Sequence, residues 1–448
     1  MTTGSGRIDA NSDETSERRD RTEALATQMT TAEVPATYRR LATAIGPEHW
    51  QGAVARQEAA IRSNHFLADY LRSEYAIAYQ LDRLRNLVAK HGEVPPEACN
   101  DRTIFPALAF AAQVLGVLSR STVKQSRTFV KRVRTAFSSA ENMHGLRLEL
   151  QAATHFTRRG HRVSWHRAKG GGSFDLLIDD LGPSGLEVEC KSISDDKGRK
   201  IHRLDALEFW GRLWKDVSGI AQSLRTGLAV VLTVPYRLPT ANEERARLAR
   251  EVVPRVLAGI SAKLGGGEDL RATSFDPADI KAAISIGPEA LRKAIDAATG
   301  TTNREAALYG TPGGGTLAFV MQSAVEDDVL VQVFAALNYY AARQFTGARG
   351  SLFWVALQGL DADQLLSVHE QDSDPGQRPT GLRLGVSDFL AGAPDHIVGV
   401  VFGSRSGLVP TEDGSTDLRG ATNFFLKEES PHWHDSFRGP LGGSGGIA

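Results

Sequence analysis

Apolar positions recur at helical spacing along the first third of the chain, after a polar N-terminus. Residues 1–32 carry Ser, Thr, Asp, Glu and Arg with almost no large apolar side chain, which predicts a disordered segment. From about residue 50 to 90, apolar side chains return with helical periodicity and Arg and Glu lie between them, which indicates a long amphipathic helix. Residues 107–118 and 122–137 fit two further helices. We therefore expect a helical region over residues 33–140.

The pattern changes after Asn142. A predicted helix is followed by three short segments rich in β-branched and aromatic residues, with glycine-rich turns between them, which is typical of an antiparallel meander. A second helix and a buried apolar strand come next. The expected elements are helix 146–157, strands 162–166, 174–178 and 186–193, helix 202–224 and strand 228–234. Residues 141–240 therefore predict an α-β-β-β-α-β core.

The remaining third predicts helices followed by a second α/β stretch. Residues 243–260 and 288–298 have helical patterns, so residues 241–300 are expected to form a helical connector. Strands and one helix are expected over residues 301–430, which either extend the first sheet or form a layer of their own. Residues 431–448 end in a Gly- and Ser-rich stretch, which predicts a flexible tail.

Composition narrows the class of protein. The chain has 448 residues with 52 basic and 53 acidic side chains, for a net charge of -1, which excludes a wholly basic nucleic-acid binder. Its two cysteines cannot form a disulfide framework, and no Cys/His spacing matches a structural zinc site. The polar N-terminus does not resemble a signal peptide. The apolar stretch 107–118 is shorter than the ~20 residues of a membrane helix. We expect a soluble, cytoplasmic α/β protein that does not contact a membrane.

Acidic and basic side chains gather on two of the predicted strands. Asp175 begins one strand, and the next carries Glu187, Glu189 and Lys191 at alternate positions, so that these three side chains share a face. A hairpin between the two strands would place Asp175 beside Glu189. Carboxylate oxygens are ligands for a hard cation such as Mg²⁺. A metal with a lysine beside it suits phosphodiester hydrolysis, which needs an activated water and stabilisation of phosphoryl charge.

This arrangement resembles the PD-(D/E)XK, or restriction-endonuclease-like, nuclease superfamily. The matching residues are Asp175 and the Glu189-Cys190-Lys191 element, with Phe174 in place of the Pro of the family name. The resemblance covers residues 141–235 and implies an α-β-β-β-α-β nuclease core. It implies Mg²⁺, with Mn²⁺ as a substitute, held by Asp175, Glu189 and the backbone carbonyl of Cys190. It also implies a metal-site role for Glu149 on the preceding helix.

Two basic segments lie near these residues in the sequence. The loop and helix start after Lys191 are expected to hold nucleic-acid phosphates through Lys197, Arg199, Lys200 and Arg203; a solvated turn around Gly198 is the alternative. Upstream, residues 124–134 and 158–169 form the most basic region of the chain. That region would add salt-dependent backbone binding, or it is a solvated helix face.

The sequence therefore predicts a metal-dependent endonuclease that hydrolyses phosphodiester bonds, with DNA as the expected partner. Asp175, Glu189, Lys191 and Glu149 are the expected catalytic residues. Restriction, repair or anti-phage defence is the expected setting. A homodimer, which cutting both strands of a duplex would favour, or a partner protein is a further expectation. The alternative is a catalytically inactive module of the same fold that binds nucleic acid or assembles with a partner protein.

Overall fold

The computed structural model describes residues 28–165, 173–302, 304–310, 314–404, 407–410 and 415–442. The protein is mixed α/β and divides into two compact units. Unit 1 comprises residues 1–51, 77–194 and 334–448, and unit 2 comprises residues 52–76 and 195–333. The expected disorder of residues 1–32 falls mostly outside the described residues. Within it, Gln28–Thr30 forms strand β1.

Unit 1 is built on a six-stranded mixed sheet with the order β14-β11-β10-β4-β3-β2. Strands β2, β3 and β4 are antiparallel neighbours, as the sequence predicts. Strand β10 runs parallel to β4 and to β11, while β14 pairs antiparallel with β11. The strands are β2 (Val163–Trp165), β3 (Leu176–Ile178), β4 (Leu186–Ile193), β10 (Ser351–Leu357), β11 (Ile397–Gly403) and β14 (Thr422–Leu426).

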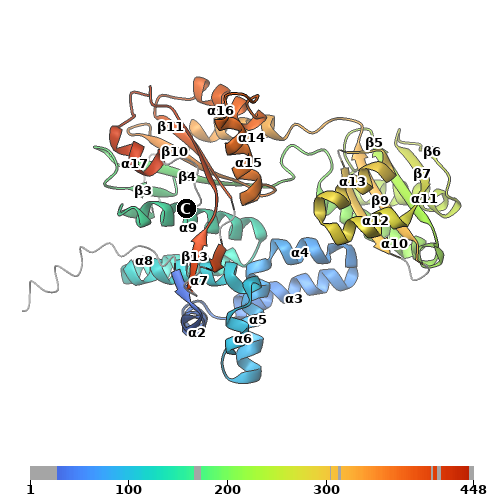
Figure 1. Ribbon diagram of the computed structural model, residues 1–448, viewed down its shortest axis with the longest axis horizontal. Coiled ribbons are helices and arrows are strands. Elements are labelled where there is room, and N and C mark those ends of the chain that lie inside the picture. Colours follow the sequence, from blue (N-terminus) through green and yellow to red (C-terminus); the bar gives the residue numbers. More distant parts are fainter. Residues whose placement is uncertain are drawn as a thin grey trace, which may run out of the picture. The chain divides into compact units, whose positions relative to one another are not determined.

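Helices cover both faces of this sheet (Figure 1). Successive side chains of a strand point to opposite faces, and β10 shows what covers each one. The ring of Trp354 contacts His155 and Phe156 of α9 (Ala140–Arg158), whereas the ring of Phe353 contacts Phe389 of α16 (Gly381–Gly392). Helix α14 (Val329–Ala341) joins the layer of α16, because Phe334 stacks on Phe389. Unit 1 is thus layered α/β/α.

The other helices of unit 1 form most of its N-terminal part, where the sequence predicts helices. Helix α7 is mostly buried and packs against α2 and α9. A small antiparallel sheet has the order β1-β13-β12. These elements are α2 (Val34–Ile45), α5 (Ala76–His91), α6 (Pro96–Cys99), α7 (Phe105–Arg120), α8 (Val123–Ala136), α15 (Ala362–Ser373), α17 (Arg438–Leu441), β12 (Gly407–Pro410) and β13 (Ser415–Arg419).

The apolar helical segment around α7 is longer than the stretch 107–118 expected from the sequence. Arg102–Arg120 spans 19 residues and is long and apolar enough to cross a membrane by length and composition alone. Of its most apolar window, 61% is buried inside the protein. Buried core helices of globular proteins pass the same test, so this helix is weak evidence for a membrane span.

Unit 2 is built on a five-stranded mixed sheet with the order β6-β7-β5-β9-β8. The inner strands β5 and β9 run parallel, and a buried cluster that includes Trp210, Leu232, Leu270 and Phe319 forms the core of the unit. Helices α3 and α14 cross the unit boundaries along the chain. The elements are α3 (Glu48–Ser63), α4 (Ala68–Glu74), α10 (Arg203–Ser223), α11 (Asn242–Ala258), α12 (Pro277–Ile286), α13 (Pro288–Thr299), β5 (Gly227–Val234), β6 (Ala262–Lys263), β7 (Asp269–Phe275), β8 (Arg304–Gly310) and β9 (Thr316–Ser323).

The structure differs from the expected core in its second half. Helix α10 and strand β5 do not join the sheet of β2, β3 and β4. Strand β5 pairs with β9 and β7 along its length in the sheet of unit 2. The parallel neighbour of β4 is β10, and α14 precedes β10 along the chain. The order α9-β2-β3-β4-α14-β10 is therefore interrupted between β4 and α14 by residues 195–328.

Three expected segment boundaries also differ. Residues 241–300 are not only helical, because β7 lies within them and pairs with β5 over seven residues. Residues 301–430 do not form one region, since β8 and β9 belong to unit 2 whereas β10, β11 and β14 belong to unit 1. The expected flexible tail contains helix α17, and Leu441 of this helix and Phe437 just before it are buried. Residues 443–448 lie outside the described part of the chain.

Candidate functional site

The hairpin of β3 and β4 brings Asp175 next to Glu189. Leu176 lies opposite Val188 in the strand register, and one step earlier the Asp175 amide donates to the Val188 carbonyl over 3.1 Å. The amide of Cys190 in turn donates to Asp175 Oδ2 over 2.9 Å. The juxtaposition expected from the sequence is confirmed, and backbone hydrogen bonds fix it.

Lys191 lies beside this pair and contacts Glu189 directly. Its Nζ stands 2.6 Å from Glu189 Oε1 and 3.9 Å from the centre of the Tyr340 ring. Tyr340 belongs to α14, so the helix that precedes β10 along the chain also contributes to the site. The sequence alone does not assign Tyr340 to the site. Its contact with Lys191 joins residues far apart in the chain, and an aromatic residue in an apolar helix gives no sign of it.

Glu149 reaches the site from α9 and is paired with Arg132 of α8. Helix α8 begins with a capping box in which the Thr122 amide donates to the Gln125 side chain over 2.9 Å. Helix α9 begins where Ser139 Oγ accepts from the Asn142 amide over 3.2 Å. Such caps satisfy amides at the start of a helix. The sequence reading placed Arg132 in a basic stretch and did not connect it to Glu149.

The three carboxyl groups share a poorly solvated neighbourhood. Glu149 and Glu189 are 4% and 2% exposed. Burial, followed by the charge of Asp175, raises the pKa of Glu149 to about 8 and that of Glu189 to about 7. Burial also raises the pKa of Asp175, while the Cys190 amide and the charges of Arg132 and Lys191 act in the opposite direction. The carboxyl groups therefore repel one another, and nearby cations offset part of that repulsion.

A cavity of about 510 Å³ opens onto this cluster. Glu149, Cys190, Lys191 and Tyr340 line it on one side, and residues of α8 that include Arg132 line it as well. Its volume falls within the ~300–1,000 Å³ of ligand-binding pockets. Acidic groups, a lysine and an arginine thus meet at a space large enough for a phosphate group and its neighbours.

The carboxylate oxygens of the site are suitable ligands for a hard cation, although the side chains do not converge on one ion position. Oε2 of Glu149 and Oε2 of Glu189 are both buried without a hydrogen-bond partner, and carboxylate oxygens are the ligands that Mg²⁺ prefers. Among the described residues, no three His, Cys, Asp or Glu side chains stand together as a group that could hold a metal. Arg132 and Lys191 hold the other oxygens of the two glutamates in this arrangement.

Glu187 does not belong to the cluster, although it shares the strand and alternation of Glu189. It is fully buried, accepts from the Thr346 amide over 2.9 Å and pairs with Arg349 over 3.2 Å. Glu187 therefore ties β4 to the segment that precedes β10. The unbroken register of β4 with β10 keeps Glu187 on the same strand face as Glu189 and Lys191, as the sequence predicts, but its partners are different ones.

The four residues expected to hold nucleic-acid phosphates all belong to unit 2. Lys200 is buried, and its Nζ pairs with Asp328 over 2.6 Å. Arg199 donates to the Asp195 carbonyl over 2.7 Å and lies 3.6 Å from Glu305. Lys197 is exposed. The ammonium of Lys200 therefore has a structural partner inside the protein.

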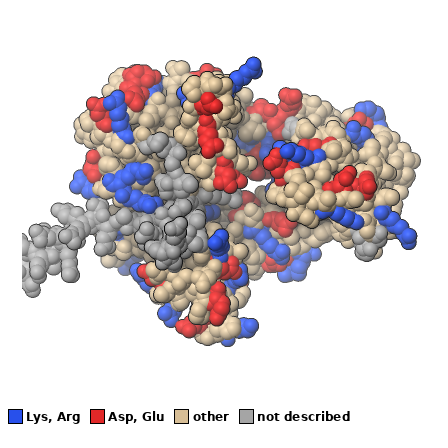
Figure 2. All heavy atoms as spheres, viewed as in Figure 1, with Lys and Arg blue, Asp and Glu red and all other residues tan. Residues whose placement is uncertain are grey.

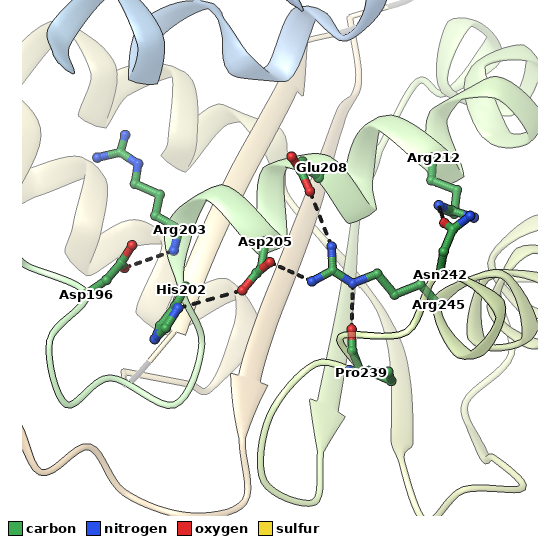
Figure 3. Close-up of polar contacts among 9 residues, drawn as sticks. All are labelled: Asp196, His202, Arg203, Asp205, Glu208, Arg212, Pro239, Asn242 and Arg245. Atoms are coloured by element: carbon green, nitrogen blue, oxygen red, sulfur yellow. Dashed lines mark hydrogen bonds and ion pairs between the residues drawn. The ribbon is translucent and has the colours of Figure 1, made fainter. Parts of the chain in front are cut away.

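Arg203 is exposed at the start of α10 (Figure 3). Its amide donates to Asp196 Oδ1 over 3.0 Å, while its guanidinium points away from that contact. Further along α10, Asp205 and Glu208 pair with Arg245 of α11 over 2.6 and 3.2 Å. Figure 3 shows this ion-pair network between the two helices. Phosphate binding by Lys197 and Arg203 stays a prediction.

Charges of both signs are interspersed over the visible face of the molecule, in keeping with a net charge close to zero (Figure 2). Comparison with protein-family models, with curated proteins and with solved structures finds no match for this chain.

Proposed function

We propose that the protein is a metal-dependent nuclease that hydrolyses phosphodiester bonds, with DNA as the expected substrate and the cluster of Asp175, Glu189 and Lys191 as its reaction centre. The observation that carries the proposal is the 2.6 Å contact between Lys191 and Glu189 beside Asp175, at the edge of a cavity. Carboxylates with an adjacent lysine are the groups that this reaction needs.

The order of elements supports the same proposal. Helix α9, the meander β2-β3-β4, helix α14 and the parallel strand β10 follow the α-β-β-β-α-β order of a restriction-endonuclease-like core. The elements that complete this order are α14 and β10 instead of α10 and β5. In this reading, residues 195–328 form an insertion between the meander and the second helix of the core.

The residues would divide the work as follows. Asp175, Glu189, Glu149 and the Cys190 carbonyl would hold Mg²⁺ or Mn²⁺, which supplies Lewis-acid stabilisation and lowers the pKa of a bound water. Lys191 would orient the attacking water and offset charge on the phosphoryl oxygens. Tyr340 limits the positions of the Lys191 ammonium through its ring contact. Arg132 lines the cavity and would attract the phosphate.

A catalytically inactive module of the same fold is the second candidate. The observation that favours it is the pairing of both glutamates with cations, in a described structure that offers no ready three-residue metal group. Such a module would keep these ion pairs for stability and bind nucleic acid or a partner protein without turnover. The two candidates differ in whether the acidic cluster binds a metal ion.

Calorimetric titration with Mn²⁺ separates the two candidates. The wild-type protein should bind the ion, and Asp175→Asn combined with Glu189→Gln should weaken binding by at least about tenfold, because two oxygen ligands lose their charge. Asp388→Asn on the exposed surface of α16 is the matched control and should bind as the wild type does. No binding by the wild type, or equal binding by the double variant, would favour the inactive module.

A further inference from the structure

A second cavity, of about 590 Å³, lies next to the first along helix α8. Thr128 and Arg132 line both cavities, and they stand one helical turn apart on the same face of α8. The second cavity is lined by the end of α7, by α8 and by strand β2. A ligand that occupies the first cavity can therefore continue into the second across a single turn of helix.

The charged side chains that line the second cavity are all positive among the described residues. Four of its described lining residues are cationic, namely Arg120, Lys124, Arg132 and Arg162, and none is acidic. The first cavity, by contrast, includes Glu141 and Glu149. In a chain with a net charge of -1, a lining without any acid selects for an anion. Phosphate groups are anions that Lys and Arg side chains bind well.

The inner wall of the second cavity is aromatic and apolar. Phe129 of α8 and Trp165 of β2 have ring centres 6.0 Å apart, and Val117 and Val163 lie with them in the lining. Gln125, Thr128 and Ser164 add polar groups. Bases stack on aromatic rings whatever their sequence, and amide and hydroxyl groups can pair with base edges. Cations around an aromatic wall thus fit a phosphate together with its base.

We propose that the second cavity binds one unpaired nucleotide of the substrate strand, next to the phosphate that is cleaved. This inference rests on the proposed nuclease function and specifies its substrate class. A paired base is covered by its partner and its stacked neighbours, so it must leave the duplex before it can enter a pocket of this kind. The preferred substrate is therefore a single strand, or a duplex with an unpaired segment at the cleavage point.

The test compares the binding of a labelled single-stranded oligonucleotide and of a blunt duplex of the same sequence by fluorescence anisotropy in EDTA. Gln125→Trp fills the cavity from an exposed position without changing its charge, and Lys124→Glu with Arg162→Glu reverses its charge at exposed positions. Lys90→Glu is the matched control, because Lys90 is an exposed cation of α5 that lines neither cavity and lies outside the basic residues 124–134 and 158–169. Circular dichroism checks that each variant is folded.

The wild type and Lys90→Glu should bind the single strand at least about fivefold more tightly than the duplex, since one stacked base contributes that much or more. Gln125→Trp should abolish this preference and leave duplex binding unchanged, and the double charge reversal should weaken single-strand binding further. Equal binding of the two oligonucleotides by the wild type, or a preference that survives in Gln125→Trp, would overturn the inference.

Cleavage in Mg²⁺ separates this outcome from the fate of the nuclease proposal. Metal-dependent cleavage without any single-strand preference keeps the reaction centre and removes the nucleotide pocket. A preference that depends on the cavity, in a protein that cleaves nothing, keeps the pocket and removes the reaction centre.

Discussion

The chemistry of the site depends on a few side chains that are held close together against their own charge repulsion. Burial and the charge of Asp175 raise the pKa of both Glu149 and Glu189. Arg132 and Lys191 each face one of these carboxyl groups. A buried carboxylate that loses its cation is costly, because water cannot replace the lost partner. The two cations therefore stabilise the cluster as well as lining the cavity.

Arg132→Met should lower the free energy of unfolding by about 1–3 kcal/mol, because it leaves a buried carboxyl group without its charged partner. Urea denaturation measures this loss. Adding Glu149→Gln to the variant should restore most of the lost stability, because no buried charge then remains at that position. Arg127→Met, which removes an exposed cation from the same helix, should change stability by less than about 0.5 kcal/mol. Equal losses in the two single variants would contradict the stabilising role of Arg132.

At the scale of elements, His155 joins helix α9 to the C-terminal helix α17. Its Nε2 lies 2.8 Å from the Pro440 carbonyl oxygen, and its ring contacts Trp354 and Phe424. Burial, followed by the charge of Arg159, lowers the pKa of His155 to about 3. The folded protein therefore holds this histidine neutral, while the unfolded chain takes up a proton below about pH 6.5.

The stability of the protein should fall as the pH drops from about 6.5 toward 3, because the unfolded state then binds one more proton than the folded state at this site. The contribution is about 1.4 kcal/mol for each pH unit in that window. His155→Gln should lose this part of the slope when unfolding is followed against pH, whereas His91→Gln at an exposed position of α5 should keep it. An unchanged slope in His155→Gln would show that the histidine becomes charged without loss of the fold.

Local elements could be predicted from the sequence, while their long-range pairings could not. The strands β2, β3 and β4 follow one another with short turns, so their antiparallel pairing and the contact of Asp175 with Glu189 are local. Strands β5 and β10 are both apolar runs that follow helices, and nothing in either run indicates which one pairs with β4. Strand β7 was missed because charged and polar residues interrupt its apolar positions.

Some residues of the site could not be predicted either, because they reach it through long-range contacts. Arg132 and Tyr340 reach the cluster from α8 and α14, so only the folded chain brings them to Glu149 and Lys191. Lys200 stands in a basic sequence that suggested an exposed loop, but Asp328 lies far along the chain and pairs with it. Long-range ion pairs of this kind leave no spacing pattern in the sequence.

Hydrogen bonds join the two ends of residues 195–333, the longer of the two segments that make up unit 2. The Asp328 amide donates to the Gly198 carbonyl over 3.0 Å, and the Lys200 amide donates to Asp327 Oδ1 over 2.7 Å. Gly198 has a φ of +81°, and a Cβ there would come within 2.6 Å of the Val329 Cα. Glycine is therefore required at this crossing. The hydrogen-bonded residues lie close to the two points where residues 195–333 connect along the chain to the segments of unit 1.

Each unit has its own buried core, so damage to one should remain largely local. Leu270→Ala in β7 should destabilise unit 2 by about 2–5 kcal/mol through a cavity in its core. Hydrogen exchange should then show faster exchange in β5 and β7 and little change in β4 and β10. Leu352→Ala in β10 is the reciprocal variant and should give the reverse pattern. Equal loss of protection in both sheets from either variant would mean that the units unfold as one.

If the cluster around Lys191 cleaves phosphodiester bonds, as we propose, a single cleavage assay should show it. Wild type, Lys191→Met and the exposed-lysine control Lys90→Met are incubated with plasmid, linear, branched and single-stranded DNA and with RNA, in Mg²⁺ or in EDTA. We predict cleavage by the wild type and by Lys90→Met that requires the metal, and a rate at least ~10²-fold lower for Lys191→Met. Undiminished cleavage by Lys191→Met, or no cleavage of any substrate by the wild type, would contradict the account.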